Sequence, residues 1–174
     1  LMMGCDGCEL WHRKAGVKHC YDGELTDRYG GRAGYPKSFE EPRTFLDRLD
    51  AALRCPDLRG KMRPEKPWLN GLPRMVFLND MGDTFTKGLP IDWLAPHLPA
   101  LADSPHQWLI LTKCASRMLE FSQTHPFPPN VWLGVTAEDQ EHFDRRWAIL
   151  RQIPATVKFI SYEPAIGPVR LGLG

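Results

Sequence analysis

Asn130-Val131-Trp132-Leu133-Gly134-Val135 is one of four short apolar runs that decide the fold of this chain. Each run follows a proline or a polar break, and each is almost continuously apolar instead of alternating. Such runs are typical of parallel strands that are covered on both faces. The other three runs are Arg74-Met75-Val76-Phe77-Leu78-Asn79, Gln107-Trp108-Leu109-Ile110-Leu111-Thr112 and Thr156-Val157-Lys158-Phe159-Ile160-Ser161.

Stretches with helical patterning separate these runs, at residues 90–102, 114–123 and 138–152. Upstream, we expect a short helix over residues 22–29 and a second helix that Pro42 opens and that continues to Leu53. The alternation of strand and helix, with long crossovers, predicts an α/β fold with right-handed parallel connections.

The number of strands indicates whether the sheet can close into a barrel. A complete (β/α)8 barrel has about 250 residues, whereas this chain has 174 residues and four visible strands. We predict a partial TIM-like barrel, the alternative being an open sheet. The chain reads as one domain over residues 1–174, with a cysteine loop at 1–35 and βα units at 74–171. Its ends, Leu1-Met2-Met3 and Leu171-Gly172-Leu173-Gly174, suggest a fragment truncated at both ends.

Composition narrows the class of protein. Hydrophobic residues make up 43% and charged residues 25%, and the formal net charge is +1. These values are ordinary for a globular protein and show no overall electrostatic footprint of nucleic-acid binding. No apolar run approaches the roughly 18 residues of a membrane span, so no membrane partner is expected. Five cysteines, an odd number with three clustered, favour a reduced, cytoplasmic setting over a disulfide framework.

The clustered cysteines are the candidate metal ligands Cys5, Cys8 and Cys20. Two residues separate the first pair, and eleven more precede the third. Three thiolates leave one coordination position of a metal centre open, which suggests chemistry as well as structure. We hypothesise an iron–sulfur cluster, and the alternative is zinc with His12 or His19 as the fourth ligand. The other two cysteines, Cys55 and Cys114, are interpreted as ordinary thiols.

Each predicted strand ends in polar residues, which should meet at one rim because parallel strands share a carboxyl edge. Lys113 is placed at a helix start, where a cation opposes the helix dipole, and this favours a specific role. Glu163 precedes Pro164, so its backbone should be extended and the side chain available for a ligand. The candidate binding residues are Asn79, Asp80, Asp83, Thr112, Lys113, Thr136, Glu138, Ser161 and Glu163.

Two of the rim residues also have a simpler interpretation. Asp83 could sit in a turn with Thr84. Thr136 is a plausible N-cap with Asp139 at the N3 position, an arrangement that resembles a capping box. For Thr136 we favour the cap over direct contact with a ligand.

Several motifs together resemble an uncharacterised family of phage and prophage proteins with a three-cysteine motif. That family is itself similar to radical S-adenosylmethionine enzymes of the spore photoproduct lyase type. The resemblance runs from Gly4 to Leu171, and its most specific parts are residues 130–140 and 161–164. The motifs are Gly4-Cys5-Asp6-Gly7-Cys8, Cys20-Tyr21, residues 76–85, Leu111-Thr112-Lys113, residues 130–140, residues 159–164 and Gly167-Pro168.

The resemblance implies a partial TIM barrel that holds a [4Fe–4S] cluster on three cysteines. The fourth iron would bind S-adenosylmethionine, whose reductive cleavage gives a 5′-deoxyadenosyl radical. Nucleic acid, or a partner protein encoded nearby, would be the implied partner. The usual radical-enzyme spacing is CxxxCxxC, and here it is CxxC-x11-C. The resemblance also implies a strand before the first cysteine, and no such strand is evident from the sequence.

Two other readings stay open at this stage. The first is a zinc-stabilised, non-catalytic binding module. The second is a parallel α/β protein without metal that binds a small anionic ligand at its strand ends.

Overall fold

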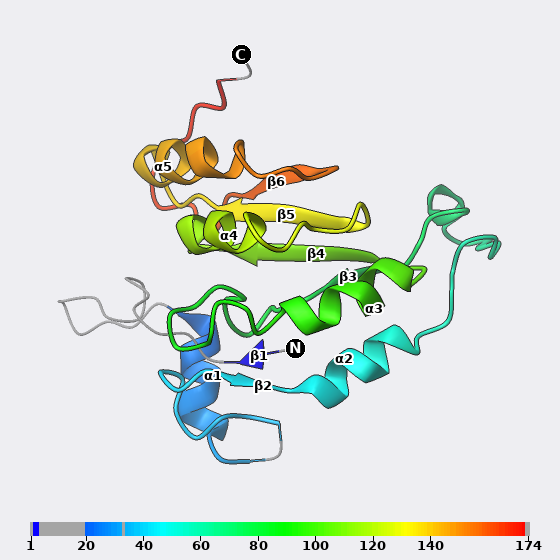
Figure 1. The fold of residues 1–174 in the computed structure, drawn as a ribbon, viewed down its shortest axis with the longest axis horizontal. Coiled ribbons are helices and arrows are strands. Elements are labelled where there is room, and N and C mark those ends of the chain that lie inside the picture. Colours follow the sequence, from blue (N-terminus) through cyan, green and yellow to red (C-terminus); the bar gives the residue numbers. More distant parts are fainter. Residues whose placement is uncertain (1, 4–19, 33, 173–174) are drawn as a thin grey trace.

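Four parallel strands form the main sheet of the computed structural model, which describes residues 2–3, 20–32 and 34–172. Their order in the sheet follows their order in the chain, β3-β4-β5-β6 (Figure 1). The strands are Met75–Phe77, Gln107–Thr112, Val131–Thr136 and Lys158–Ser161. The prediction of a mixed α/β fold with a parallel sheet is therefore confirmed, and no closed barrel is formed by the described residues.

Helices connect the strands close to the predicted positions. They are α1 (Tyr21–Tyr29), α2 (Leu46–Leu53), α3 (Leu98–Asp103), α4 (Ala115–Ser122) and α5 (Gln140–Leu150), with 3₁₀ helices at Pro67–Leu69 and Ala95–His97. The predicted helix over 90–102 is shorter than expected. Pro96 and Pro99 each lie in the first turn of a separate short helix, the position where a proline needs no N–H partner.

Helices cover one face of the sheet, and this face forms the main core (Figure 1). Burial alternates along β4, where Trp108, Ile110 and Thr112 are buried. Leu109 and Leu111 point to the other face and are partly exposed. Helices α3, α4 and α5 contribute buried side chains to this core, and along β5 the residues Leu133–Thr136 are buried on both faces, as expected for a covered parallel strand.

A two-residue strand that the sequence did not reveal precedes the first cysteine. Met2–Met3 (β1) pairs antiparallel with Arg43–Thr44 (β2). The prediction that Pro42 opens a helix is therefore wrong, since the residues that follow it are extended. Both methionines are buried, and the Met2 N–H donates to Asn79 Oδ1 at 2.8 Å. This bond joins β1 to the chain just after β3.

Within the described part of the chain, no helix has the length and apolar character needed to span a membrane.

Gly134 in β5 is a position where a side chain would collide. Its parallel register partner on β6 is Phe159, whose ring carbons would lie 2.4 Å from an added Cβ. The phenyl ring thus occupies the space over the glycine. We predict that Gly134→Ala lowers the free energy of unfolding by about 1–3 kcal/mol, because the ring must shift.

A double-mutant cycle with Phe159→Ala, measured by urea denaturation, checks the cause. The cost of the alanine at position 134 should largely disappear when the ring is absent. Strictly additive costs would contradict this account.

Candidate functional site

A cavity of about 490 Å³ lies at the carboxyl ends of the parallel strands. Seven of the nine predicted strand-end residues line it, together with Cys20 from the predicted cysteine set. The seven are Asn79, Asp80, Asp83, Thr112, Lys113, Thr136 and Glu163. The structure therefore brings most of the predicted rim to one place.

Further lining residues were not among the predicted candidates. Tyr21 and Asp22 belong to the first turn of α1, which closes one side of the cavity. Phe39, Phe77 and Leu111 add an apolar wall. The cavity volume falls in the range typical of small-molecule sites, about 300–1,000 Å³.

Asp83 ties the ends of β3 and β4 together at the floor of the cavity. Its Oδ1 accepts from the Phe85 N–H at 2.9 Å and from Thr112 Oγ1 at 2.5 Å, and its Oδ2 accepts from the Lys113 N–H at 2.7 Å. Thr112 Oγ1 in turn accepts from the Cys114 N–H at 2.8 Å. These bonds assign Asp83 and Thr112 a role in holding the rim in shape.

Asn79 links the cavity to the start of the chain. It is buried, its Oδ1 accepts from the Met2 N–H, and its Nδ2 donates to Thr84 Oγ1. Both the oxygen and the nitrogen of this side-chain amide are thus hydrogen-bonded within the protein. Met3, which follows Met2, precedes the cysteine segment, residues 5–20. Cys20, the last residue of that segment, lines the cavity.

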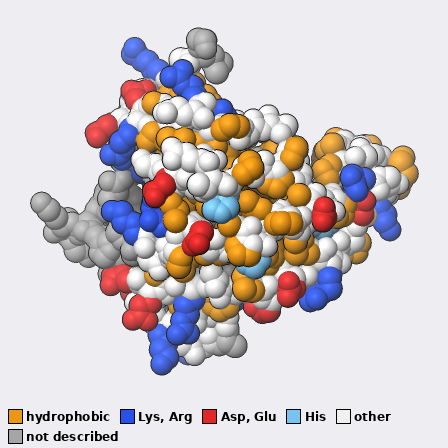
Figure 2. All heavy atoms as spheres, in the orientation of Figure 1, with side chains coloured by type: hydrophobic (Ala, Val, Ile, Leu, Met, Phe, Trp, Pro, Cys, Tyr) orange, Lys and Arg blue, Asp and Glu red, His pale blue; other side chains and the backbone are white. Residues whose placement is uncertain are grey.

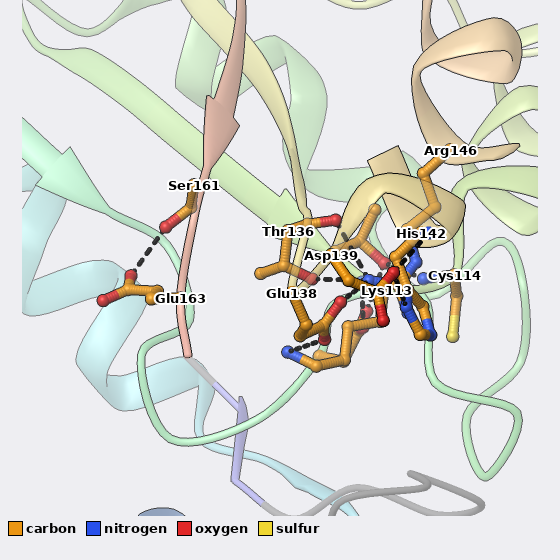
Figure 3. Close-up of polar contacts among 11 residues, drawn as sticks. Lys113, Cys114, Thr136, Glu138, Asp139, His142, Arg146, Ser161 and Glu163 are labelled. Carbon is orange, nitrogen blue, oxygen red and sulfur yellow. Dashed lines mark hydrogen bonds and ion pairs between the residues drawn. The ribbon is translucent and has the colours of Figure 1, made fainter. Parts of the chain in front are cut away.

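Glu138 is fully buried and forms the centre of a charged cluster (Figure 3). Its Oε2 lies 2.6 Å from Arg146 Nη1, and its Oε1 lies 3.4 Å from Lys113 Nζ. Arg146 Nη1 also donates to the carbonyl and the hydroxyl of Thr136, at 3.0 Å each. Glu138 does not line the cavity itself, but it forms an ion pair with the ammonium of Lys113, which does.

Ser161 is the second candidate binding residue, after Glu138, that does not line the cavity. Its hydroxyl donates to Glu163 Oε1 at 2.6 Å, which orients the carboxylate of Glu163 (Figure 3). Glu163 itself lies in the loop after β6.

The helix cap predicted at Thr136 is wrong. Asp139 is the N-cap of α5, and its Oδ1 accepts from the His142 N–H at 2.9 Å. This backbone bond, followed by a side-chain bond from the same histidine, lowers the pKa of the Asp139 carboxyl. Thr136 is still within β5, so its side chain can face the cavity instead.

Asp22 is the most perturbed acid at the site. Its pKa is raised to about 7, first by burial and then by the negative charge of Asp80, while Lys113 acts in the opposite direction. One of its oxygens, Oδ1, is buried without a hydrogen-bond partner in the described structure. A perturbed carboxyl in a cleft is a typical mark of a functional site.

The metal-ligand prediction is only partly covered by the structure. Cys20 is half-buried, at the N-cap position of α1. Cys5 and Cys8, and the alternative ligands His12 and His19, lie outside the described residues. Among residues 2–3, 20–32 and 34–172, no group of three metal-binding side chains is close enough to hold an ion. Cys55 donates its thiol to the carbonyl of Ala51, in keeping with an ordinary role.

A family model described as "Protein of unknown function (DUF5131)" matches residues 2–173. The chain belongs to this family. No curated protein and no solved structure matches it. In this DUF5131 chain, the family match thus spans both the cysteine segment and the strand-end cavity.

Sequence reasoning missed Tyr21 and Asp22 at the cavity. The candidates were taken only from residues that directly follow predicted strands, whereas Tyr21 and Asp22 lie at the start of helix α1. Their position directly after Cys20 was the available signal, since a residue next to a candidate ligand shares its surroundings.

We predict that Arg146→Met destabilises the fold by about 3–5 kcal/mol, because it leaves the buried carboxylate of Glu138 without its closest partner. Arg145→Met is the matched control, since Arg145 is exposed on the same helix. Thermal and urea unfolding of both variants check the difference. Equal stability of the two would show that the buried pair has no net role.

Proposed function

We propose that this chain is an iron–sulfur protein of the radical S-adenosylmethionine type. The observation that carries the proposal is the composition of the cavity, in which Cys20 lies beside seven strand-end residues expected to bind a cofactor. The finer fold proposed with it is a partial TIM-like barrel. The proposal includes the kinship with the phage and prophage three-cysteine proteins, and a cytoplasmic setting.

Cys20, the one predicted metal ligand among the described residues, lines the cavity, and this supports a cluster at this position. Met3 is held near the same wall by β1 pairing and by the bond from Met2 to Asn79. Cys5 follows Met3 by two residues, which span at most about 7 Å of extended chain. Met3 and Cys20, the described residues on either side of Cys5 and Cys8 in the chain, are thus both near the cavity, which supports the proposal.

The cluster would supply the electron that cleaves the sulfonium of S-adenosylmethionine. The protein's own residues would bind and orient this molecule. Lys113, which is ion-paired with Glu138, would bind a ligand carboxylate, and Asp22 and Asp80 would accept from amine or hydroxyl groups. Phe39, Phe77 and Leu111 would exclude water and pack against the adenine ring.

Anaerobic reconstitution tests the cluster. We expect a brown protein with iron, acid-labile sulfide, a broad visible absorption band and an electron paramagnetic resonance signal after reduction. Cys20→Ser should lose most of the iron, because thiolates hold such clusters. Cys55→Ser, a half-buried thiol away from the cavity, is the control and should keep it.

A colourless protein with stoichiometric zinc would overturn the cluster assignment and support the zinc-stabilised module. In that case His12→Ala or His19→Ala should release the metal. A chain that binds its ligand equally well after Cys5→Ser, Cys8→Ser and Cys20→Ser would instead be a metal-free binding protein.

Calorimetric titration with S-adenosylhomocysteine tests the cofactor pocket separately. Lys113→Gln should weaken binding by about tenfold or more, since a hydrogen bond to a charged group contributes roughly 1.5–3 kcal/mol. Lys87→Gln, exposed and outside the cavity, should have no effect. Equal affinity of wild type and Lys113→Gln would remove Lys113 from the binding site.

A further inference from the structure

The connection between α2 and β3, residues 54–74, is a basic arm that projects from the body of the molecule (Figure 1). It holds six of the 22 lysine and arginine residues of the chain but only two of its 21 acidic residues. Its net charge is therefore +4, whereas the whole chain carries +1. A local excess of this kind marks a surface for an anionic partner, even where the overall charge is near zero.

The basic arm is ordered by its own hydrogen bonds. The Arg63 N–H donates to Asn70 Oδ1 at 2.6 Å, and successive turns bond Lys66 to Arg63 and Asn70 to Pro67 along the backbone. The 3₁₀ helix Pro67–Leu69 lies within the basic arm. A surface that is already ordered loses little conformational entropy when it binds.

Large apolar side chains on the basic arm point outward. Trp68 is 69% exposed and Met62 is 77% exposed, although neither is needed to cover the core. Figure 2 shows hydrophobic and basic side chains together on this projection. An indole that is this exposed buries little apolar area within the chain. Its ring face can instead stack on a flat ring of a partner.

Two cations of the basic arm are available for a partner. Arg59 is occupied, because it forms a two-pronged pair with Asp57. Lys61 and Lys66 are exposed, and neither takes part in an ion pair with another described residue. Lys61 directly precedes Met62, and Lys66 lies two residues before Trp68, so cationic and large apolar side chains alternate along the basic arm.

We propose that the basic arm binds single-stranded nucleic acid, with a base stacked on Trp68 and phosphates bound by Lys61 and Lys66. Stacking on an exposed aromatic ring combined with lysine or arginine contacts is how proteins bind single strands without reading sequence. A membrane surface is favoured less, because the outward apolar residues are few and separated by charges. An acidic protein would match the charge but gives no use for the exposed indole.

This surface is separate from the strand-end cavity. The basic arm leads into the amino end of β3, and the cavity lies at the carboxyl ends of the same strands. The inference therefore does not rest on the proposed function. Its role would be to tether a polymer, which raises the concentration of the polymer near the rest of the molecule.

Fluorescence anisotropy of a labelled oligothymidylate, titrated with the full chain between about 50 and 200 mM salt, tests the proposal. Lys61→Gln with Lys66→Gln should weaken binding and reduce the slope of log affinity against log salt by about 1.4, since each phosphate contact on a single strand contributes about 0.7. Trp68→Ala should weaken binding roughly tenfold and leave the slope unchanged.

The matched control is Lys87→Gln with Arg145→Gln, two exposed residues outside the basic arm whose loss changes the net charge equally. The control should bind like wild type, and all variants should unfold at the same temperature. No binding at low salt, or equal weakening by the control, would overturn the proposal. So would Trp68-dependent binding to phosphatidylserine vesicles or to polyglutamate that is tighter than binding to the oligonucleotide.

Discussion

The carboxylate of Asp83 is the contact on which the candidate site depends. By accepting hydrogen bonds from Phe85, Thr112 and Lys113, it joins the loop after β3 to the end of β4. Without this junction, neighbouring parallel strands would share a sheet but not a shaped rim. Lys113 makes two contacts there: its backbone N–H donates to Asp83, and its ammonium forms an ion pair with Glu138. Preorganisation of this kind lowers the entropy that a binding site loses when it takes up a ligand.

The parallel sheet and the rim were predictable because both follow from short-range patterns. Continuous apolar runs mark strands, and the carboxyl ends of parallel strands meet by geometry, which is why Asn79, Lys113 and Glu163 come together. The open face of the sheet was not predictable in this way. Leu109 and Leu111 are as apolar as the buried Ile110. The sequence of a continuously apolar strand therefore does not indicate on which face the helices pack.

The elements missed by sequence reasoning are those made by long-range contacts. Met2–Met3 is too short to show any period, and it is a strand only because Arg43–Thr44 and Asn79 supply its partners. The place of Asp22 and Tyr21 on the cavity depends in turn on where α1 settles. Likewise, the cap of α5 went to Asp139 because β5 continues through Thr136, which a local capping pattern does not reveal.

The bond from the Met2 N–H to Asn79 has a consequence for the order of folding. Its partners are 77 residues apart, so closing this contact is entropically expensive and depends on structure already formed. A two-residue strand has no stability of its own, and Asn79 is positioned only once β3 has paired with β4. β1 is therefore brought to Asn79 late, after the sheet has formed. It would take its place in the final stage of assembly, beside strand ends that are already paired.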